Sequence, residues 1–331
     1  MDKIYNDFNE SNKNKKFELF PNVVEEILRL EKNQILHYII NRYKYDVFPI
    51  EKRLSDYPPN LQIEIASICN FRCIFCYQTD NLFNKKSNGF MGQMDFKVFK
   101  KIIDEVEGKI QFITLASRGE PTLCKDFSKM LSYVKNKFLG FKVNTNASML
   151  NEDKIHAILN SNISTLVISA DAAEEKEYSK YRVNGDLKKI ISNLKKFNQI
   201  KNDYYPNSKI ITRVSGVKFS SKQDYQKLKS FWSEFVDQVA FVNYLPWENI
   251  YIKEKNGITT PCTDLWRRMF IWWDGYANPC DVDYKSNMKL GNIFNNSIKE
   301  IWNSSQYNDL RKMHLNSDRQ KLQICSKCNL V

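Results

Sequence analysis

Three cysteines stand within eight residues of this 331-residue chain, in the stretch ASICNFRCIFCYQ. Cys69, Cys73 and Cys76 follow the spacing C-x3-C-x2-C, and no fourth cysteine follows nearby. Three thiolates can hold three irons of a four-iron cluster and leave the fourth iron open for another ligand. A zinc site built on three cysteines would recruit a histidine or a fourth cysteine, and none of the three histidines lies within 30 residues of these cysteines. Zinc is therefore the weaker alternative.

A second group of cysteines lies near the C-terminus and consists of Cys262, Cys280, Cys325 and Cys328. Between the first two, the sequence predicts a hairpin that turns at Asp274-Gly275. A helical pattern follows, and the chain ends with a C-x2-C pair. Four thiolates can ligate every iron of a second cluster, with a structural zinc ribbon as the alternative.

The first cysteine motif resembles that of the radical S-adenosylmethionine (radical SAM) superfamily, including the aromatic residues Phe75 and Tyr77 on either side of its last cysteine. The resemblance implies that the open iron binds the amino and carboxylate groups of SAM, and that Phe75 and Tyr77 contact the cofactor. Reductive cleavage of SAM then gives a 5′-deoxyadenosyl radical, which abstracts hydrogen from a substrate. In such enzymes the protein positions the cofactor and excludes water.

The segment SRGEPTL extends the resemblance, because Gly119, Glu120 and Pro121 are similar to the GGE-type motif of the family. Gly119 is expected to let the backbone approach the cofactor closely. Glu120 or nearby carbonyls are expected to accept from the SAM ammonium. Asn144 and Asn146 end the third predicted strand, where the family often contacts ribose or substrate. Turn chemistry at the strand end is the alternative for both.

Further SAM contacts are implied after the fourth predicted strand. Ser169 and Arg182 resemble a family pair that binds the SAM carboxylate, for which arginine supplies a bidentate donor. Asp171 is expected to touch ribose or to serve the turn. Two residues are candidates for catalysis: Arg213, as a buried charge facing the site, and Cys124, as a hydrogen donor to the substrate radical. Their alternatives are an outward surface arginine and a small buried hydrophobe.

The C-terminal segment resembles the auxiliary-cluster domains called SPASM and, in their shorter form, Twitch. A full SPASM domain carries more cysteines than the four found in this segment. The resemblance therefore implies a Twitch-like domain with one fully ligated cluster that passes electrons. Together the two resemblances imply SAM and two [4Fe-4S] clusters, one binding SAM and one auxiliary. An electron donor such as flavodoxin or ferredoxin is expected.

An alternation of strand and helix patterns predicts the scaffold for these residues. Such alternation indicates an α/β fold with a parallel sheet, here a partial (β/α)6 TIM-like barrel, with the motifs at the carboxyl ends of its strands. The predicted strands are 61–66, 110–117, 141–147, 164–171, 209–217 and 239–245. The predicted helices are 94–108, 126–140, 151–161, 173–181, 187–200 and 221–235.

Three regions are predicted along the chain. Residues 1–60 form an N-terminal helical extension with a helix over 22–43, and no winged-helix leader-peptide binder is expected there. Residues 61–246 form the radical SAM partial barrel. Residues 247–331 form a small, cysteine-rich Twitch/SPASM-like domain with a helical run over 297–313.

Composition limits the partners. The net charge is +12, but the lysines are scattered along the chain, so nucleic acid is not expected as a partner. No apolar run reaches the roughly 18 residues that a membrane span requires. The N-terminal sequence is polar and lacks the apolar stretch of a secretory signal. We therefore expect a cytoplasmic protein, in a compartment where thiols stay reduced.

The expected reaction is the dehydrogenation of a small polar substrate by a radical SAM oxidoreductase. The one-cluster C-terminal segment resembles that of the aminocyclitol dehydrogenase branch, so a sugar, an aminocyclitol or a nucleotide-linked sugar is expected. A phosphorylated substrate fits the positive charge. The alternative is peptide or protein modification by thioether crosslinking, epimerisation or formylglycine formation. An RNA-binding modifier is a third hypothesis, supported only by the charge.

Overall fold

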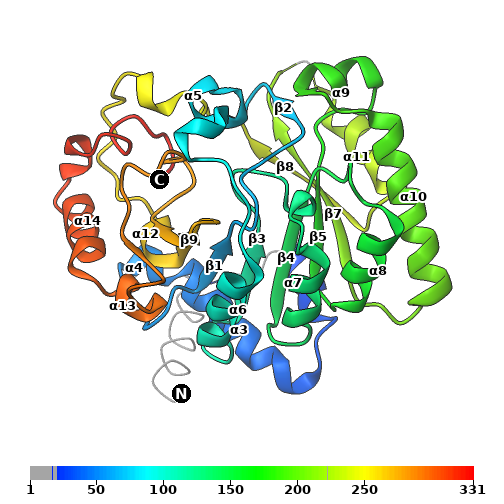
Figure 1. Ribbon diagram of the computed structural model, residues 1–331, viewed down its shortest axis with the longest axis horizontal. Helices are drawn as coiled ribbons and strands as arrows, with labels where there is room; N and C mark the ends of the chain where they lie inside the picture. The colour runs from blue at the N-terminus through cyan, green and yellow to red at the C-terminus, as the bar shows by residue number, and fades with distance from the viewer. Residues whose placement is uncertain (1–16, 18–20, 222) are drawn as a thin grey trace.

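The computed structural model describes Phe17, residues 21–221 and residues 223–331 (Figure 1). Its main sheet has nine strands in the order β11-β10-β9-β1-β3-β4-β5-β7-β8. The six strands from β1 to β8 in this order pair in parallel. Helical segments connect them, and α10 and α11 lie on the side of the molecule opposite the C-terminal helices. This arrangement confirms the predicted α/β fold with a partial (β/α)6 barrel.

The parallel strands are shorter than predicted, and the chain between them is helical in the predicted places. The strands are β1 (Asn60–Ile63), β3 (Phe112–Leu115), β4 (Gly140–Thr145), β5 (Thr165–Ser169), β7 (Ile211–Lys218) and β8 (Gln238–Asn243). The helices are α6 (Phe96–Val106), α7 (Phe127–Val134), α8 (Glu152–Asn160), α9 (Glu175–Tyr181), α10 (Leu187–Tyr204) and α11 (Tyr225–Ser233).

Local chemistry sets several of these helix ends. Asp95, Asn151 and Asp186 each precede a helix and accept a hydrogen bond from a backbone N–H of its first turn. The helix predicted over 126–140 is wrong at its C-terminal end. It stops at Val134, because the chain turns with Asn136 at a φ of 63° and reaches β4 a few residues later.

The single helix predicted over 22–43 is also wrong, because two helices form there. They are α2 (Pro21–Ile27) and α3 (Lys32–Asp46), followed by α4 (Phe48–Glu51). The break comes from a capping box in which Glu31 caps α3 and its N–H donates to Gln34 Oε1 at 3.0 Å. Part of the predicted extension, residues 1–16 and 18–20, lies outside the described residues.

The two N-terminal helices cover the amino end of the barrel. Val23 of α2 and Tyr38 of α3 form a buried apolar cluster with Phe112, the first residue of β3. The Tyr38 and Phe112 rings meet edge to face, with centroids 5.0 Å apart. Any ligand inside the barrel therefore lies above a floor made by these helices.

The C-terminal segment continues the barrel sheet. The predicted hairpin is confirmed as β9 (Arg268–Ile271) and β10 (Tyr276–Asn278), and Gly275 has the positive φ of 81° that the turn requires. Strand β9 also pairs in parallel with β1, residue by residue along its whole length. The remaining elements there are β11 (Gly291–Asn292), α12 (Asp264–Arg267), α13 (Ile298–Trp302) and α14 (Ser305–Leu315).

The helical run predicted over 297–313 is interrupted, since α13 ends at Trp302 and Ser304 caps the separate helix α14 with its side chain. Shorter elements fill the loops. They are β2 (Arg72–Cys73), β6 (Arg182–Val183), α5 (Asn81–Asn84) and the 3-10 turns Tyr77–Thr79, Lys86–Asn88, Pro121–Leu123, Ile250–Ile252 and Asp318–Lys321.

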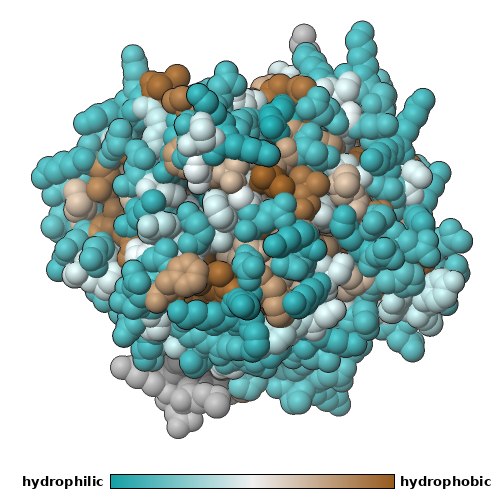
Figure 2. Space-filling view, in the orientation of Figure 1, coloured by the Kyte–Doolittle hydropathy of each residue, from teal (hydrophilic) through white to brown (hydrophobic). Residues whose placement is uncertain are grey.

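The surface seen in Figure 2 is mostly hydrophilic, with hydrophobic residues in small separate groups. Within the described part of the chain, every helix is too short or too polar to cross a membrane.

Gly140 is expected to be required for closure of the barrel floor. A Cβ at this position would lie 1.7 Å from Cδ1 of Phe112, so the ring would have to leave its place beneath the strands. Gly140→Ala is expected to lower the free energy of unfolding by about 1–3 kcal/mol, measured by urea unfolding of the anaerobically reconstituted protein. Ser132→Ala, on the exposed side of α7, should stay within about 0.5 kcal/mol of the parent. Equal stability of both variants would contradict the packing described.

Candidate active site

The loop after β1 carries Cys69, Cys73 and Cys76 to the carboxyl end of the barrel. Its middle cysteine belongs to β2, which pairs antiparallel with β6 so that Cys73 lies opposite Arg182. Sequence reasoning missed this ladder, because two residues on each side show no periodicity. The ladder fastens the cysteine loop to the segment that follows β5.

The three thiols interact electrostatically with one another. Burial, then Glu120, and more weakly Cys73 raise the pKa of the Cys69 thiol to about 12. Burial and then Cys73 also raise the pKa of Cys76. Iron displaces such protons when it binds. In residues 21–221 and 223–331, no three potential ligands are close enough together to share one metal ion. Three thiols within electrostatic range of one another are the donors that the predicted cluster requires.

Gly119 lies directly against the backbone of the cysteine loop. A Cβ on Gly119 would meet the carbonyl oxygens of Ile68 and Ala66 at 2.4 and 2.5 Å. Gly119 was predicted to let the backbone approach a cofactor closely, and that contact stays a prediction. Within the protein, the close neighbour of Gly119 is the cysteine loop. Pro121, two residues later, starts the 3-10 turn that follows.

Glu120 has hydrogen-bond partners within the protein for both carboxylate oxygens. It is 3% exposed. Its Oε1 accepts from the hydroxyls of Thr122 and Thr145 at 2.5 and 2.6 Å, and its Oε2 accepts from the Asn146 N–H at 2.7 Å. Burial raises the pKa of Glu120 despite these donors. The carboxylate thus joins the ends of β3 and β4, and its contact with a SAM ammonium stays a prediction.

The two predicted asparagines differ in their surroundings. Asn146 donates from Nδ2 to Asn70 Oδ1 at 3.0 Å and accepts from the Ser148 hydroxyl at 2.6 Å, so it ties β4 to the cysteine loop. Asn144 lines a cavity inside the barrel. One asparagine therefore supports the loop and the other faces space for a ligand, while contacts with SAM stay a prediction for both.

Asp171 and Arg182 form a buried ion pair. Asp171 Oδ2 lies 2.6 Å from Arg182 Nε, and Asp171 Oδ1 accepts from the Val217 N–H at 2.7 Å. Burial alone would lower the pKa of Arg182, but Asp171, together with Cys73 and Tyr178, more than offsets burial and the pKa is raised. The charged guanidinium lies 3.7 Å from Cys73 Sγ and 5.6 Å from the centre of the Phe75 ring. Arg182 therefore lies beside the cysteines, and Asp171 is engaged by the protein, while the predicted contacts of both residues with SAM stay predictions.

Ser169 is partly exposed, whereas Cys124 is buried. Ser169 is the last residue of β5 and is in register with Ser215 of β7. Its predicted pairing with Arg182 on a SAM carboxylate stays a prediction. Cys124 belongs to the main hydrophobic core, and its Sγ lies 3.9 Å from the Met94 carbonyl oxygen. These surroundings agree with the small buried hydrophobe considered as its alternative, and the hydrogen-donor role stays a prediction.

Arg213 lines the barrel interior near the floor. Its Nη2 lies 3.1 Å from Glu26 Oε1 on α2, and its Nε donates to Gln238 Oε1 at 2.7 Å. Sequence reasoning did not identify Glu26 as a partner of Arg213, because the two residues are 187 positions apart along the chain. The pair gives Arg213 a structural role, while its catalytic role stays a prediction.

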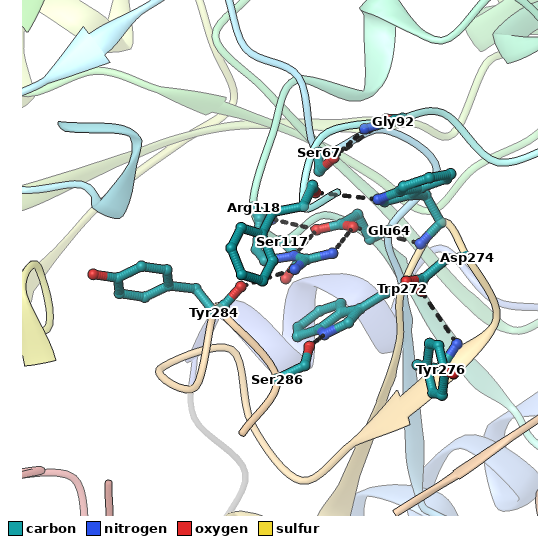
Figure 3. A network of polar contacts seen from close by, with 12 residues as sticks. Glu64, Ser67, Gly92, Ser117, Arg118, Trp272, Asp274, Tyr276, Tyr284 and Ser286 are labelled. Carbon is teal, nitrogen blue, oxygen red and sulfur yellow. Dashed lines mark hydrogen bonds and ion pairs between the residues drawn. The ribbon is translucent and has the colours of Figure 1, made fainter. Parts of the chain in front are cut away.

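A buried ion pair between Glu64 and Arg118 is a further feature that sequence reasoning missed (Figure 3). Arg118 Nη2 and Nε lie 2.5 and 2.6 Å from the two Glu64 oxygens. Arg118 Nη1 donates to the Tyr284 carbonyl at 2.8 Å, and the guanidinium lies 4.2 Å from the centre of the Trp272 ring. Because Tyr284 and Trp272 belong to the C-terminal segment, Arg118 joins that segment to the barrel.

Tyr77 belongs to the boundary between the two cysteine groups. Its ring stacks on Tyr284 with centroids 5.0 Å apart, and its hydroxyl donates to the Ser117 carbonyl at 2.7 Å. These rings form a buried apolar cluster against which both Cys76 and Cys280 pack. Tyr77 was predicted to contact the cofactor, and within the protein it packs against the C-terminal segment.

The four C-terminal cysteines also interact with one another. Burial and then Cys262 raise the pKa of Cys325, and burial and then Cys325 raise the pKa of Cys280. Burial is likewise the main cause that raises the pKa of Cys328. Four neighbouring thiols held in this way fit a fully ligated cluster.

Arg319 holds the loop that contains the last two cysteines. It is 1% exposed. It donates to the carbonyls of Thr260, Cys325, Cys328 and Leu330 at 2.5–3.0 Å. Charged donors give hydrogen bonds about twice as strong as neutral ones, so one side chain closes the loop around the site.

A cavity of about 330 Å³ lies inside the barrel. Inward-facing residues of all six parallel strands line it, among them Gln62, Thr114, Asn144, Val167, Ser215 and Ala240. Glu26 of α2 also borders it. Its volume is that of a small-molecule site.

Two family models match the chain. One is described as the radical SAM superfamily and matches residues 63–219, and the other is described as an iron–sulfur cluster-binding domain, SPASM, and matches residues 262–329.

Three curated relatives resemble the chain to different extents. The SAM-dependent 2-deoxy-scyllo-inosamine dehydrogenase of Niallia circulans is 20% identical over 82% of this chain and 92% of its own length. The cysteine-type anaerobic sulfatase-maturating enzyme of Clostridium novyi is 24% identical over 80% of this chain and 83% of its own length. A cofactor-modifying protein for the tungsten-containing aldehyde ferredoxin oxidoreductase of Pyrococcus furiosus is 28% identical, but over only 34% of this chain and 30% of its own length.

Two solved structures share the fold. BtrN in complex with AdoMet and 2-DOIA aligns with a TM-score of 0.57 at 18% identity, over 82% of this chain and 93% of that one. SuiB of Streptococcus suis bound to S-adenosylmethionine aligns with a TM-score of 0.62 at 16% identity, over 94% of this chain and 78% of that one.

Loss of Asp171 is expected to destabilise the site. Asp171→Asn preserves the shape but leaves Arg182 buried without its counter-charge, and such changes cost about 3–5 kcal/mol. Urea unfolding of the reconstituted protein measures the loss. Glu174→Gln removes one partner of the exposed pair with Lys227 and should leave the unfolding midpoint unchanged. If both variants unfold at the same urea concentration, the ion pair does not hold the site together.

Arg319 is expected to be required for iron binding by the C-terminal cysteines but not by Cys69, Cys73 and Cys76. Arg319→Met removes the four carbonyl contacts and should lower the iron content from about eight to about four atoms per chain. Iron and sulfide analysis after anaerobic reconstitution measures this. Lys321→Met, an exposed neighbour, should keep the full content. An Arg319→Met protein with undiminished iron would show that the loop closes without this side chain.

Proposed function

We propose that this chain, which belongs to the radical SAM superfamily and carries a SPASM domain, catalyses the dehydrogenation of a small polar substrate. A sugar, an aminocyclitol or a nucleotide-linked sugar is the substrate class. The cavity inside the barrel carries the proposal, because its volume of about 330 Å³ suits a molecule of this size and polar strand residues line it.

The two domains bind SAM and iron–sulfur clusters. Cys69, Cys73 and Cys76 would hold the cluster that binds SAM, and the C-terminal cysteines would hold the auxiliary cluster. When bound, these groups supply a 5′-deoxyadenosyl radical that takes the carbinol hydrogen atom and an acceptor for the second electron, while the hydroxyl proton leaves to a base.

The chain's own residues would position the reactants. Arg182 would place a positive charge beside the cysteines, where the SAM carboxylate is expected, with Ser169 on the neighbouring strand end. The backbone around Gly119 would offer acceptors for the SAM ammonium. Asn144 would then separate this region from the cavity, since it lines the cavity wall at the end of β4. A substrate in the cavity would thus lie below the cofactor and away from bulk water.

The relative from Niallia circulans supports this proposal, because it matches over 92% of its length and its name describes an aminocyclitol oxidation. We propose a flavodoxin or ferredoxin as the electron carrier, since SAM cleavage takes up one electron and the substrate oxidation returns one electron through the auxiliary cluster, which the same carrier can accept. We further propose a cytoplasmic location, where thiols and clusters stay reduced.

Peptide or protein modification is the second candidate. The resemblance to the sulfatase-maturating enzyme of Clostridium novyi favours it, because that match also covers most of both proteins. The two candidates differ in what must enter the barrel: a free small molecule or one side chain of a polypeptide. A direct test of hydrogen transfer separates them.

The auxiliary site is expected to be required for oxidation but not for SAM cleavage. With dithionite, Cys280→Ala should still form 5′-deoxyadenosine, while a Cys69→Ala control should form none. With 2-deoxy-scyllo-inosamine deuterated at the oxidised carbon, the parent should transfer deuterium to 5′-deoxyadenosine and release the ketone. Cys280→Ala should lose the ketone, because the second electron has no acceptor.

Chromatography with mass spectrometry measures both products. Ketone formation by Cys280→Ala at the parent rate would overturn the oxidation mechanism. Deuterium transfer from a cysteine- or serine-containing peptide, and not from the aminocyclitol or sugars, would establish the second candidate instead.

A further inference from the structure

The cavity inside the barrel has an excess of positive charge. Arg42, Lys142, Arg213 and Arg268 border it, and Glu26 is the carboxylate among its lining residues. A protein interior holds charges only when they are paired, so the partner of each cation decides what the cavity can bind.

Two of the four cations have acidic partners outside the cavity. Arg42 forms an ion pair with Asp46 at 2.8 Å. Arg268 lies 3.2 Å from Asp264, and the Asp281 carboxyl also interacts with it. These two arginines are therefore neutralised by their own neighbours.

Lys142 and Arg213 share one carboxylate oxygen. Glu26 Oε1 lies 3.0 Å from Lys142 Nζ and 3.1 Å from Arg213 Nη2. The same carboxylate accepts a short hydrogen bond from Tyr38. Gln238 of β8 accepts from Arg213 Nε, and its amide donates to the carboxylate of Glu25, which is exposed at the surface of α2. Among the groups in direct contact at the cavity floor, two positive charges therefore face one negative charge, and Glu25 reaches Arg213 only through Gln238.

This positive floor lies directly below the predicted cofactor region. Lys142 and Asn144 point to the same face of β4 because they are two residues apart, about 7 Å along the strand. Arg213 and Ser215 have the same relation on β7, and all four residues line the cavity. A molecule that reaches from Asn144 to Lys142 would have one end near the cofactor and the other end at the charge.

We propose that Lys142 and Arg213 bind an anionic group of the substrate, a phosphate or a carboxylate, at the floor of the barrel cavity. The inference rests on the proposed function and narrows its substrate class to small polar molecules with a negative group. Arginine offers such a group two parallel donors and lysine a point charge. Glu26 competes with the anion for both cations, which keeps them ordered when the cavity holds no substrate.

Equilibrium binding tests this proposal without turnover. Isothermal titration calorimetry would use the full chain with its clusters and SAM, under anaerobic conditions and without reductant. Glucose 6-phosphate, glucuronate and glucose share a hexose ring and differ in their charged group. Both anions should bind more tightly than glucose, and the stronger of the two identifies phosphate or carboxylate as the preferred group.

Variants that are expected to change the anion affinity in opposite directions distinguish anion binding by these residues from a purely structural role. Lys142→Met should weaken binding of the anions roughly tenfold, the effect of one lost charged hydrogen bond, and should leave glucose unchanged. Arg213→Gln, made separately, should do the same. Glu26→Gln should strengthen anion binding, because it removes the competing carboxylate. A residue that only supports the fold would not produce changes of opposite sign.

Lys229→Met is the matched control, since it removes one positive charge from the exposed side of α11 and should change nothing. The proposal is overturned if neither anion binds more tightly than glucose, or if Glu26→Gln and Lys142→Met shift the affinity in the same direction. Because no reductant is present, these outcomes do not depend on SAM cleavage or dehydrogenation. Failure of this inference is therefore distinguishable from failure of the proposed function.

Discussion

The cysteine loop and the loop after β3 touch backbone to backbone, and the geometry of the whole site depends on this contact. Gly119 makes it possible, because any Cβ would lie 2.4 Å from the Ile68 carbonyl oxygen. The next residue, Glu120, then gathers donors from Thr122, Thr145 and Asn146 in a buried position. A buried carboxylate without these donors would cost several kcal/mol, so the ends of β3 and β4 have one favourable arrangement. Since Cys69 follows Ile68 directly, the position of the first thiol follows from the same contact.

Buried ion pairs extend this constraint across parts of the chain that are distant in sequence. Arg118 pairs with Glu64 and reaches the C-terminal segment through the Tyr284 carbonyl, and Arg182 pairs with Asp171 beside the cysteines. Breaking such a pair is costly, because it leaves one charge buried alone. The main role of these charged residues is therefore structural. Only the donor atoms that are not bonded to a protein partner remain available to bind a cofactor.

The features predicted from sequence are those that neighbouring residues determine. The six βα units and the hairpin at Gly275 follow from periodicity and turn chemistry, and the cysteine groups follow from spacing. The break before α3 was missed because the capping box of Glu31 and Gln34 lies within an apolar pattern that continues on both sides. The pairing of β9 with β1 and the partners of Arg118 and Arg213 join segments far apart along the chain. A single sequence carries no signal for such contacts, so the role of Asp171 was assigned without knowledge of its partner.

The attachment of the C-terminal segment bears directly on the chemistry. A segment docked as a separate body would leave the distance between the two cysteine groups variable. Here the β9–β1 ladder and the buried cluster around Tyr77 and Tyr284 fix that distance, and Cys76 and Cys280 pack against the same cluster from the two groups. In the proposed oxidation, which removes a hydrogen atom first and an electron second, this fixed distance keeps the electron acceptor at a constant separation from the substrate. The helices α2 and α3 cover the amino end of the barrel, opposite the carboxyl end at which the first cysteine group lies.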